Sequence, residues 1–411
     1  MAQPAHDLEM QSVRAVPPAF VTMVVLSAAV LLAGLVSVVA LTTTTGAATS
    51  PSDAVTALLN AASTGNVTAM LDTIDPVERS AIAPAVTTVV SDLEKDGILD
   101  QGTDLSHIPG VSATVTAPTT KTEDLSGVQP GLTAVVFTGG SAAIHVDPSQ
   151  LPLGTLVKGF LGQATSTHAL DTTVALGGPQ AEDHPIVTIQ RGDQTYVSLG
   201  YTVAEWARRA AGQPLPNPSS AVPAVGESSA EAVARTLVSA VTAGDLTRVI
   251  ELTAPEAAAP LHDYAGLLPH GATHALPVKV TSLDLATSPV DGGTLVSVTD
   301  FSATVGSGEV VTLTPQGCLS FTGGTAGSHQ MCAPAGTTLL SGYGIVAVEH
   351  GSTWYLDPYR SVLDNVEHAL SSVNLSTISG LLKTFGSGGG LGSIGSFGGL
   401  LKAPDTASSG G

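Results

Sequence analysis

The spacing of apolar residues changes several times along this chain of 411 residues, and each period predicts a different element. The longest apolar run is residues 19–41, which contains no charged side chain. As a helix it would reach about 34 Å at ~1.5 Å per residue, enough to cross a hydrocarbon core of about 30 Å. We therefore expect a transmembrane helix, whose backbone hydrogen bonds are satisfied within the helix itself.

The flanking charges predict which side of the membrane the chain occupies. Residues 1–18 contain one basic side chain, Arg14, and the next basic residue after the run is Arg79. The positive-inside rule then places the N-terminus in the cytoplasm and the bulk of the chain outside the plasma membrane. A cleaved signal peptide is the alternative, because small residues lead up to Ala40, but signal-peptide apolar regions run about 7–15 residues and are shorter than this one.

Helical and strand periods alternate twice after a short spacer at 42–51. Apolar residues recur at helical spacing from 52 to 95, and short β-branched runs separated by Gly, Pro and Asp follow from 111 to 199. Residues 212–229 contain four prolines and no helical pattern, which predicts a linker. The helical period then restarts at Glu231.

The two halves match residue by residue, which indicates a tandem duplication. A shift of 179 positions without a gap places Leu58, Gly65, Asn66, Val67 and Pro76 on Leu237, Gly244, Asp245, Leu246 and Pro255. Near the other end, a shift of 159 positions places 185–209 on 344–368, with Tyr196 on Tyr355. Matched ends in the same order, with strands between them, mean that one unit occurs twice.

The opening phrases SPSDAVTALLNAASTGNVTAMLDTIDP and SSAEAVARTLVSAVTAGDLTRVIELTAP and the closing phrase G-x-x-W-Y-L resemble the NTF2-like superfamily. They are similar to its membrane-anchored extracytoplasmic members in actinobacteria, and the Ala-rich, Lys-poor composition is typical of such genomes. The resemblance implies an α+β fold in which helices cover a curved antiparallel sheet and leave a pocket for a ligand. Both halves depart from the family by a helix after the last strand.

We thus expect an α+β protein with an N-terminal transmembrane helix and two tandem NTF2-like domains. Its segments are a cytoplasmic N-terminus at 1–18, the transmembrane helix at 19–41, the spacer at 42–51, domain 1 at 52–211, the Pro-rich linker at 212–229, domain 2 at 230–370 and a Gly/Ser-rich disordered tail at 371–411.

The charge balance excludes two classes of partner. The formal net charge is −20, and the 14 Lys and Arg residues form no basic run. Nucleic acid and anionic lipid surfaces both require clustered positive charge, so neither is expected as a partner. An acidic excess instead favours solubility of an exposed ectodomain.

The only two cysteines, Cys318 and Cys332, lie close together in a Gly-rich segment. Outside the membrane an even number of cysteines at short spacing favours a disulfide, and two free thiols are the alternative. A zinc site is disfavoured because no second Cys or His pair lies at ligand spacing.

Candidate chemistry is sparse, and no cofactor or metal is expected. His262, His270 and His274, with Asp263, could form a metal site, but Pro and Gly between them favour exposed loop histidines. By resemblance to ketosteroid isomerase, the bases would be Asp72 or Asp75, with Tyr264 as oxyanion donor. The pair Trp354 and Tyr355 on the closing strand is expected in the core rather than in a cavity.

Two hypotheses of function follow. The first is a non-catalytic, membrane-anchored module that binds an envelope protein or a small apolar ligand, for instance as an accessory subunit of an envelope transport system similar to Mce-associated proteins. The second is an isomerase-like or hydrolase-like enzyme that uses one pocket. A convergent acid–base pair with perturbed pKa values in one pocket would favour the second.

Overall fold

The computed structural model describes residues 48–155, 157–158, 169–268, 277–306, 308–314, 318–323, 328–332 and 343–372. The predicted transmembrane helix at 19–41 and nearly all of the predicted tail lie outside these residues. Within the described parts of the chain, no helix is both long and apolar enough to cross a membrane.

The first repeat opens with three helices that are capped by their own sequence. They are α2 (Pro51–Ser63), α3 (Val67–Thr73) and α4 (Pro76–Lys95). The side chains of Ser50, Asn66 and Asp75 accept backbone N–H groups in the first turns of α2, α3 and α4, respectively. Such caps replace hydrogen bonds that the first turn of a helix lacks.

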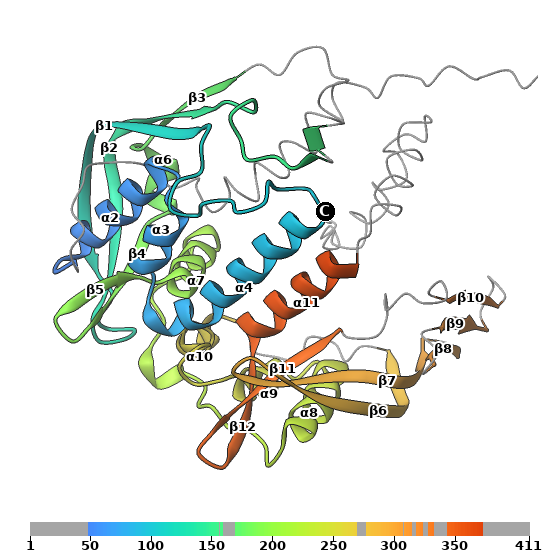
Figure 1. Ribbon diagram of the computed structural model, residues 1–411. Coiled ribbons are helices and arrows are strands. Elements are labelled where there is room, and N and C mark those ends of the chain that lie inside the picture. The colour runs from blue at the N-terminus through green and yellow to red at the C-terminus, as the bar shows by residue number, and fades with distance from the viewer. Residues whose placement is uncertain are drawn as a thin grey trace, which may run out of the picture.

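A curved antiparallel sheet follows the helices (Figure 1). Its strands are β1 (Val111–Asp124), β2 (Leu132–Val146), β3 (Leu170–Ala175), β4 (Ile186–Arg191) and β5 (Gln194–Val197). The order is β1-β2-β4-β5, and β3 pairs with the other half of β2. The short helix α6 (Pro179–Asp183) precedes β4, and the repeat ends with α7 (Leu199–Ala210).

The second repeat follows the same order of helices and strands, but its third helix is shorter and its sheet has an added hairpin. Its helices are α8 (Ala230–Ala243), α9 (Leu246–Glu251) and α10 (Ala259–Asp263), with 3₁₀ turns at Pro218–Ser220 and Ala265–Leu267. Its strands are β6 (Val278–Val290), β7 (Gly293–Val305), β8 (Glu309–Leu313), β9 (Cys318–Thr322), β10 (His329–Cys332), β11 (Gly344–His350) and β12 (Thr353–Asp357), and α11 (Pro358–Ser372) follows. The sheet order is β10-β9-β8-β7-β11-β12, with β6 beside β7. The α+β class with curved antiparallel sheets is therefore confirmed.

Equivalent residues of the two repeats make equivalent backbone contacts. Ile74 bridges Val197 in parallel in the first repeat, and Thr253 bridges Leu356 in the second. The next residue donates its N–H back to the strand at 2.8 Å in both cases. The shifts of 179 and 159 positions therefore connect residues with the same structural role.

The additional element of the second repeat is the β9–β10 hairpin. Cys318 and Cys332 are directly opposite in its register and form a disulfide. The predicted pairing of the two cysteines is thus present. The disulfide joins the neighbouring strands β9 and β10 at the outer edge of the sheet.

The Pro-rich stretch at 212–229 docks on the second repeat. Glu227 exchanges two backbone hydrogen bonds of 2.8 Å with Trp354 on the edge strand β12, and the Val225 N–H donates to the Glu251 carbonyl. In the first repeat Ala48 accepts a backbone hydrogen bond from Thr195 at the matching position. The last residues of the expected linker therefore belong to the repeat that follows.

The closing tyrosines lie at matching positions, as the duplication predicts. Tyr196 is opposite Ile189 and Tyr355 is opposite Val348, each in the last hairpin of its repeat. Both side chains are half-buried, and so is Trp354. These aromatic residues pack against the cores without being enclosed by them.

Candidate functional site

Ionisable side chains are buried mainly where the two repeats meet. The last helix of each repeat packs on the other repeat: α11 lies beside α4, and α7 contacts α10 (Figure 1). We call the contact between these four helices the seam. It has approximate two-fold character, because α7 is equivalent to α11 and the 179-residue shift places α10 on residues 80–84, within α4. The seam is the most distinctive polar feature of the described chain.

Glu205 is the centre of the seam and is completely buried. Its carboxylate accepts hydrogen bonds from Arg208 at 2.6 and 2.8 Å and from Arg209 at 2.8 Å, all within α7. The hydroxyl of Tyr264, from the second repeat, donates to the same carboxylate at 3.1 Å. Burial acts to raise the pKa of Glu205, but the hydrogen bonds and charges of both arginines outweigh it and hold the pKa below its usual value.

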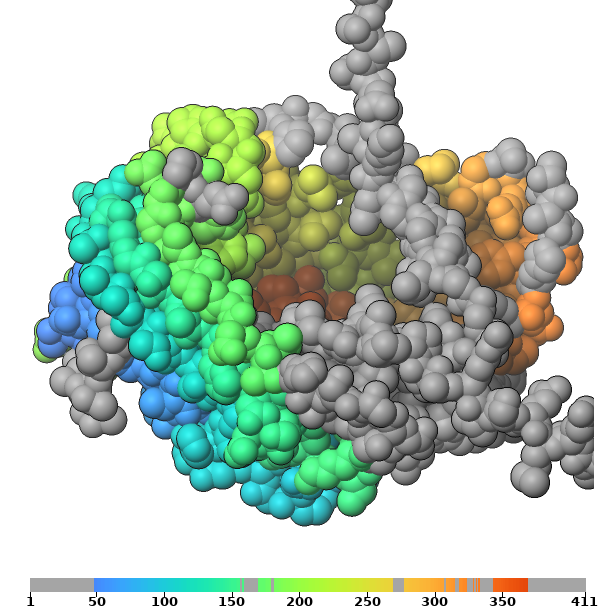
Figure 2. Space-filling model, turned by 90° about the horizontal axis from the view of Figure 1, so that it is seen from above, coloured from blue at the N-terminus to red at the C-terminus, as the bar shows by residue number. Residues whose placement is uncertain are grey.

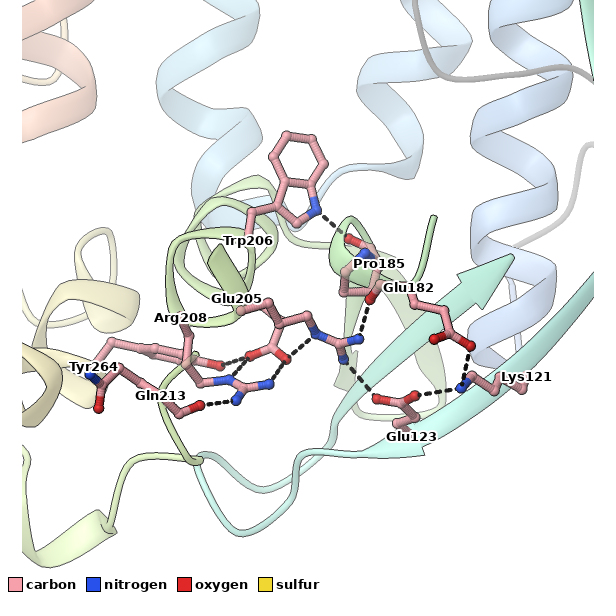
Figure 3. A network of polar contacts seen from close by, with 10 residues as sticks. Lys121, Glu123, Glu182, Pro185, Glu205, Trp206, Arg208, Gln213 and Tyr264 are labelled. Carbon is pink, nitrogen blue, oxygen red and sulfur yellow. Dashed lines mark hydrogen bonds and ion pairs between the residues drawn. The ribbon is translucent and has the colours of Figure 1, made fainter. Parts of the chain in front are cut away.

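The ion pairs continue from Glu205 towards the surface of the first repeat (Figure 3). Arg209 also contacts Glu123 on β1 at 2.7 Å, and Lys121 bridges Glu123 and Glu182 at 3.2 and 3.5 Å. These four side chains join α7, β1 and α6. The network therefore fixes α7 on its own sheet while Tyr264 connects it to the other repeat.

A second contact across the seam joins Tyr201 and Asp263. The hydroxyl of Tyr201 donates to the Asp263 carboxylate at 2.5 Å, and the rings of Tyr201 and Tyr264 lie 6.3 Å apart between centroids. Burial, followed by the hydrogen bond and charge of Asp263, raises the pKa of Tyr201 far above its usual value. Burial also raises the pKa of Asp263, although the Tyr201 hydrogen bond opposes this.

Glu78 binds the N-terminus of α7. Its carboxylate accepts the Ser198 hydroxyl at 2.7 Å and the N–H groups of Leu199 and Gly200 at 2.7 and 2.9 Å. Burial raises the pKa of Glu78 despite these three donors. The Tyr359 hydroxyl packs so closely on Gly200 that a Cβ atom there would overlap it, so a larger residue at position 200 would displace the Tyr359 side chain.

The isomerase-like residues named from the sequence do not converge. Asp75 is buried and accepts two hydrogen bonds from Arg191, at 2.7 and 3.2 Å, besides capping α4. Asp72 is mostly exposed and pairs with Arg79 at 3.1 Å. Tyr264 lies in the seam, bonded to Glu205. The three groups thus occupy three separate environments.

The expectation that His262 is an exposed loop residue is wrong. His262 lies on α10 and is buried, with Nδ1 2.8 Å from the Val222 carbonyl and Nε2 3.1 Å from the Thr253 hydroxyl. His270 and His274 lie outside the described residues. Among the residues described, no group of three His, Cys, Asp or Glu side chains could hold a metal ion. What His262 does is attach the Pro-rich stretch to the second repeat.

Seen from above, the molecule is hollowed beside the seam (Figure 2). Green atoms of the first repeat form one wall of this hollow, and yellow-green and red-brown atoms of the second repeat form its floor. The hollow is thus shaped by both repeats together.

No protein-family model, curated protein or solved structure matches this chain significantly.

Sequence reasoning missed Glu205, Tyr201 and Glu78 as buried polar residues. One signal was available for Glu205, because Arg208 and Arg209 follow it at i+3 and i+4 on one helix, where oppositely charged side chains meet. No such signal existed for Glu78, whose partners at 198–200 are distant in the sequence.

Proposed function

We propose that this chain is a membrane-anchored, extracytoplasmic protein whose two NTF2-like repeats bind or scaffold components of the cell envelope without catalysis. One observation carries the proposal: the buried acids at the seam already accept hydrogen bonds from donors of the protein itself, which are arginines, tyrosines or the N-terminus of α7. The partner would be an envelope protein or a small apolar ligand, and an accessory subunit of an envelope transport system would have this design.

The bonding of these groups argues for a mechanical role. A general base needs a lone pair that faces its substrate. Both carboxylate oxygens of Asp75 instead accept hydrogen bonds from Arg191, and the Tyr264 hydroxyl donates a hydrogen bond to Glu205. The hydrogen bonds that Tyr201 and Tyr264 make across the seam link the two repeats, which suits a protein that presents a surface to a partner.

An isomerase-like enzyme is the second candidate, and one observation favours it. Tyr201 and Asp263 are adjacent, and burial raises the pKa of each. In the ketosteroid isomerase arrangement, a tyrosine and a protonated acid both donate to the oxyanion of the substrate. In this protein the Tyr201 hydroxyl donates to Asp263 itself. For such a reaction, this hydrogen bond would have to break so that both groups could donate to a substrate oxygen.

Protease digestion tests the proposed location. The full-length chain should lose all residues beyond about position 50 when protease is added to intact spheroplasts, since these residues would lie outside the membrane. A cytoplasmic marker protein is the control for intact membranes. Full protection of the repeats, with an intact control, would reject an extracytoplasmic location.

Complementation of a deletion strain tests the absence of catalysis. Variants Tyr201→Phe and Asp263→Asn should restore the envelope phenotype, whereas a chain with residues 1–41 replaced by a cleavable signal peptide should not. Tyr196→Phe is the matched control, because it makes the same change at a half-buried tyrosine outside the seam. If the two seam variants fail while their amount and melting temperature match those of the control, the enzyme is the better proposal.

A further inference from the structure

Strand β3 has an unprotected edge. It pairs with β2 through six consecutive residue pairs, from Leu170 opposite Val146 to Ala175 opposite Ser141, and among the described strands it pairs with β2 alone. Every residue of β3 is exposed, including Leu170 at 43% and Val174 at 49%. In Figure 1 it runs along the outer border of its sheet. Backbone groups on such an edge can bond another strand.

The second repeat shows that this position accepts a further strand. There β8 pairs with β7 as β3 pairs with β2, and β9 and β10 continue the sheet beyond β8. The first repeat has no counterpart of this hairpin among its described residues. The same place in the fold is therefore filled in the second repeat, whereas no described strand fills it in the first.

The other described sheet edges carry the features that usually prevent strand addition. Strand β1 has Pro118, Lys121 and two register shifts, and β6 has Lys279, Pro289 and two register shifts. Strands β5 and β12 are covered by bridges from the segments before and after the opening helices. Strand β10 has only four residues and is cross-linked to β9. The sequence of β3, LDTTVA, contains no Lys, Pro or Gly, and its register with β2 is unbroken.

We propose that two copies of this chain associate through β3, whose strands pair antiparallel about a two-fold axis perpendicular to the sheet. The axis passes Thr172, so that Thr172 lies opposite the partner's Thr172 and Leu170 lies opposite the partner's Val174. Cross-strand apolar pairs of this kind stabilise sheets.

This register is selected by charge and by the alternation of side chains. A two-fold axis perpendicular to the sheet leaves the same face of both copies on the same side of the extended sheet. Opposite side chains must therefore lie on the same face, so the register between the two β3 strands can change only in steps of two residues. Moving the axis to Asp171 would set that carboxylate against its own copy, and like charges directly opposite are destabilising. In the proposed register Asp171 lies opposite the partner's Thr173.

The resulting dimer is expected to be weak. A single six-residue edge buries less than the roughly 1,200–2,000 Å² of a standard stable interface, so association should depend on protein concentration. The backbone hydrogen bonds of the added strand would supply most of the specificity, as in other cases of strand addition.

Cysteine cross-linking tests the pairing and its register in the full-length chain, purified in a mild detergent. Residues directly opposite have Cα atoms about 4.5–5.5 Å apart, which suits a disulfide. Thr172→Cys should therefore form a covalent dimer under mild oxidation. Thr173→Cys is the matched control, because two copies of it would lie about 8 Å apart, beyond the reach of a disulfide.

A charge exchange tests the same register without cysteines. Leu170→Glu and Val174→Lys each place a charge opposite an apolar residue, and each should raise the dimer dissociation constant at least tenfold in sedimentation equilibrium. The double variant should restore dimerisation, because the introduced carboxylate of one copy and the introduced ammonium group of the other would then meet across the axis. Both positions are exposed, and circular dichroism verifies that each variant is folded.

Three results would overturn the proposal. They are a wild-type chain that stays monomeric at all concentrations, equal cross-linking of Thr172→Cys and Thr173→Cys, and a dimer that neither single charge variant weakens. If the wild-type chain stays monomeric, the partner of β3 would instead be an extended segment of a different protein.

Discussion

Thr202 and Ser361 make the same two hydrogen bonds in the two repeats. Each hydroxyl donates to the carbonyl four residues earlier at 2.6 Å, and each accepts the N–H of a buried valine, Val187 at 2.9 Å or Val346 at 2.8 Å. This contact attaches the last helix of each repeat to the sheet beneath it. The last helix of each repeat is thus held by a polar contact that both repeats share.

Removing these hydroxyls should destabilise the protein. Thr202→Val or Ser361→Ala leaves a buried N–H without a partner, which costs about 1–3 kcal/mol. Urea unfolding followed by circular dichroism would measure the loss. Thr87→Val is the matched control, because the Thr87 hydroxyl bonds only within α4 and is exposed, so a change within about 0.5 kcal/mol is expected. An effect at Thr202 no larger than at Thr87 would contradict this role.

Glu205→Gln should destabilise the seam by about 3–5 kcal/mol, because Arg208 would lose its buried carboxylate partner and Arg209 would keep only Glu123. Glu231→Gln, which breaks an exposed pair with Arg235, should cost less than about 1 kcal/mol. The folded-state pKa of Glu205 is lowered, so its contribution is complete above the unfolded value of about 4.3 and is lost as the pH falls below it. Wild type and Glu205→Gln should therefore converge in stability in acid, and a constant difference down to pH 3 would argue against this assignment.

Glu78 should show the opposite pH dependence. Burial raises its folded-state pKa, so its stabilising contribution is present below about pH 4.3 and declines as the pH rises through the folded-state value. Relative to Glu78→Gln, the wild type should therefore lose stability as the pH rises above about 4.3. Thermal melts of both proteins across this range would measure the difference. Parallel pH curves would show that Glu78 has the same pKa in both states.

The two repeats should associate as separate fragments. Residues 48–212 and 222–372 each contain their own helices, sheet and edge bridge, so each should melt cooperatively. When the fragments are mixed, the buried groups of the seam should bring them together in gel filtration. Tyr264→Ala should weaken this complex, and Tyr355→Ala, which lies outside the seam, should not. If neither fragment folds alone, the repeats share one core.

The disulfide should act on the second repeat alone. Replacing Cys318 and Cys332 with Ser releases a loop with a sequence separation of 14 residues. The chain-entropy model assigns about 2–4 kcal/mol to such a loop. Unfolding of fragment 222–372 should register this loss, while fragment 48–212 serves as the control. A change below about 0.5 kcal/mol would mean that the β9–β10 hairpin unfolds independently of the sheet.

Much of each repeat was predictable because its determinants are local. Helical and alternating periods, together with caps such as Asn66 and Asp245, specify elements within a few residues of themselves. The duplication was visible because both copies retain the same spacing of apolar residues and the same capping positions. The cysteine pairing was predictable from spacing alone, since only one pair exists.

The polar site was not predictable, because its partners are far apart in the sequence. Asp75 pairs with a residue 116 positions away, and Tyr264 reaches a carboxylate 59 positions earlier. The expectation that His262 is exposed failed for the same reason: its partner Val222 lies in a stretch that reads as a linker.

The sequence by itself determined the order of helices and strands, their repetition, the disulfide and the prediction of a membrane anchor. Only the tertiary structure decided that the last helix of each repeat packs on the other repeat, burying Glu205 and Tyr201. The physical reason is that a periodic pattern states which face of an element is apolar but not which partner covers it. Burial of a charge depends on that partner, because only a specific set of donors can compensate for the lost water.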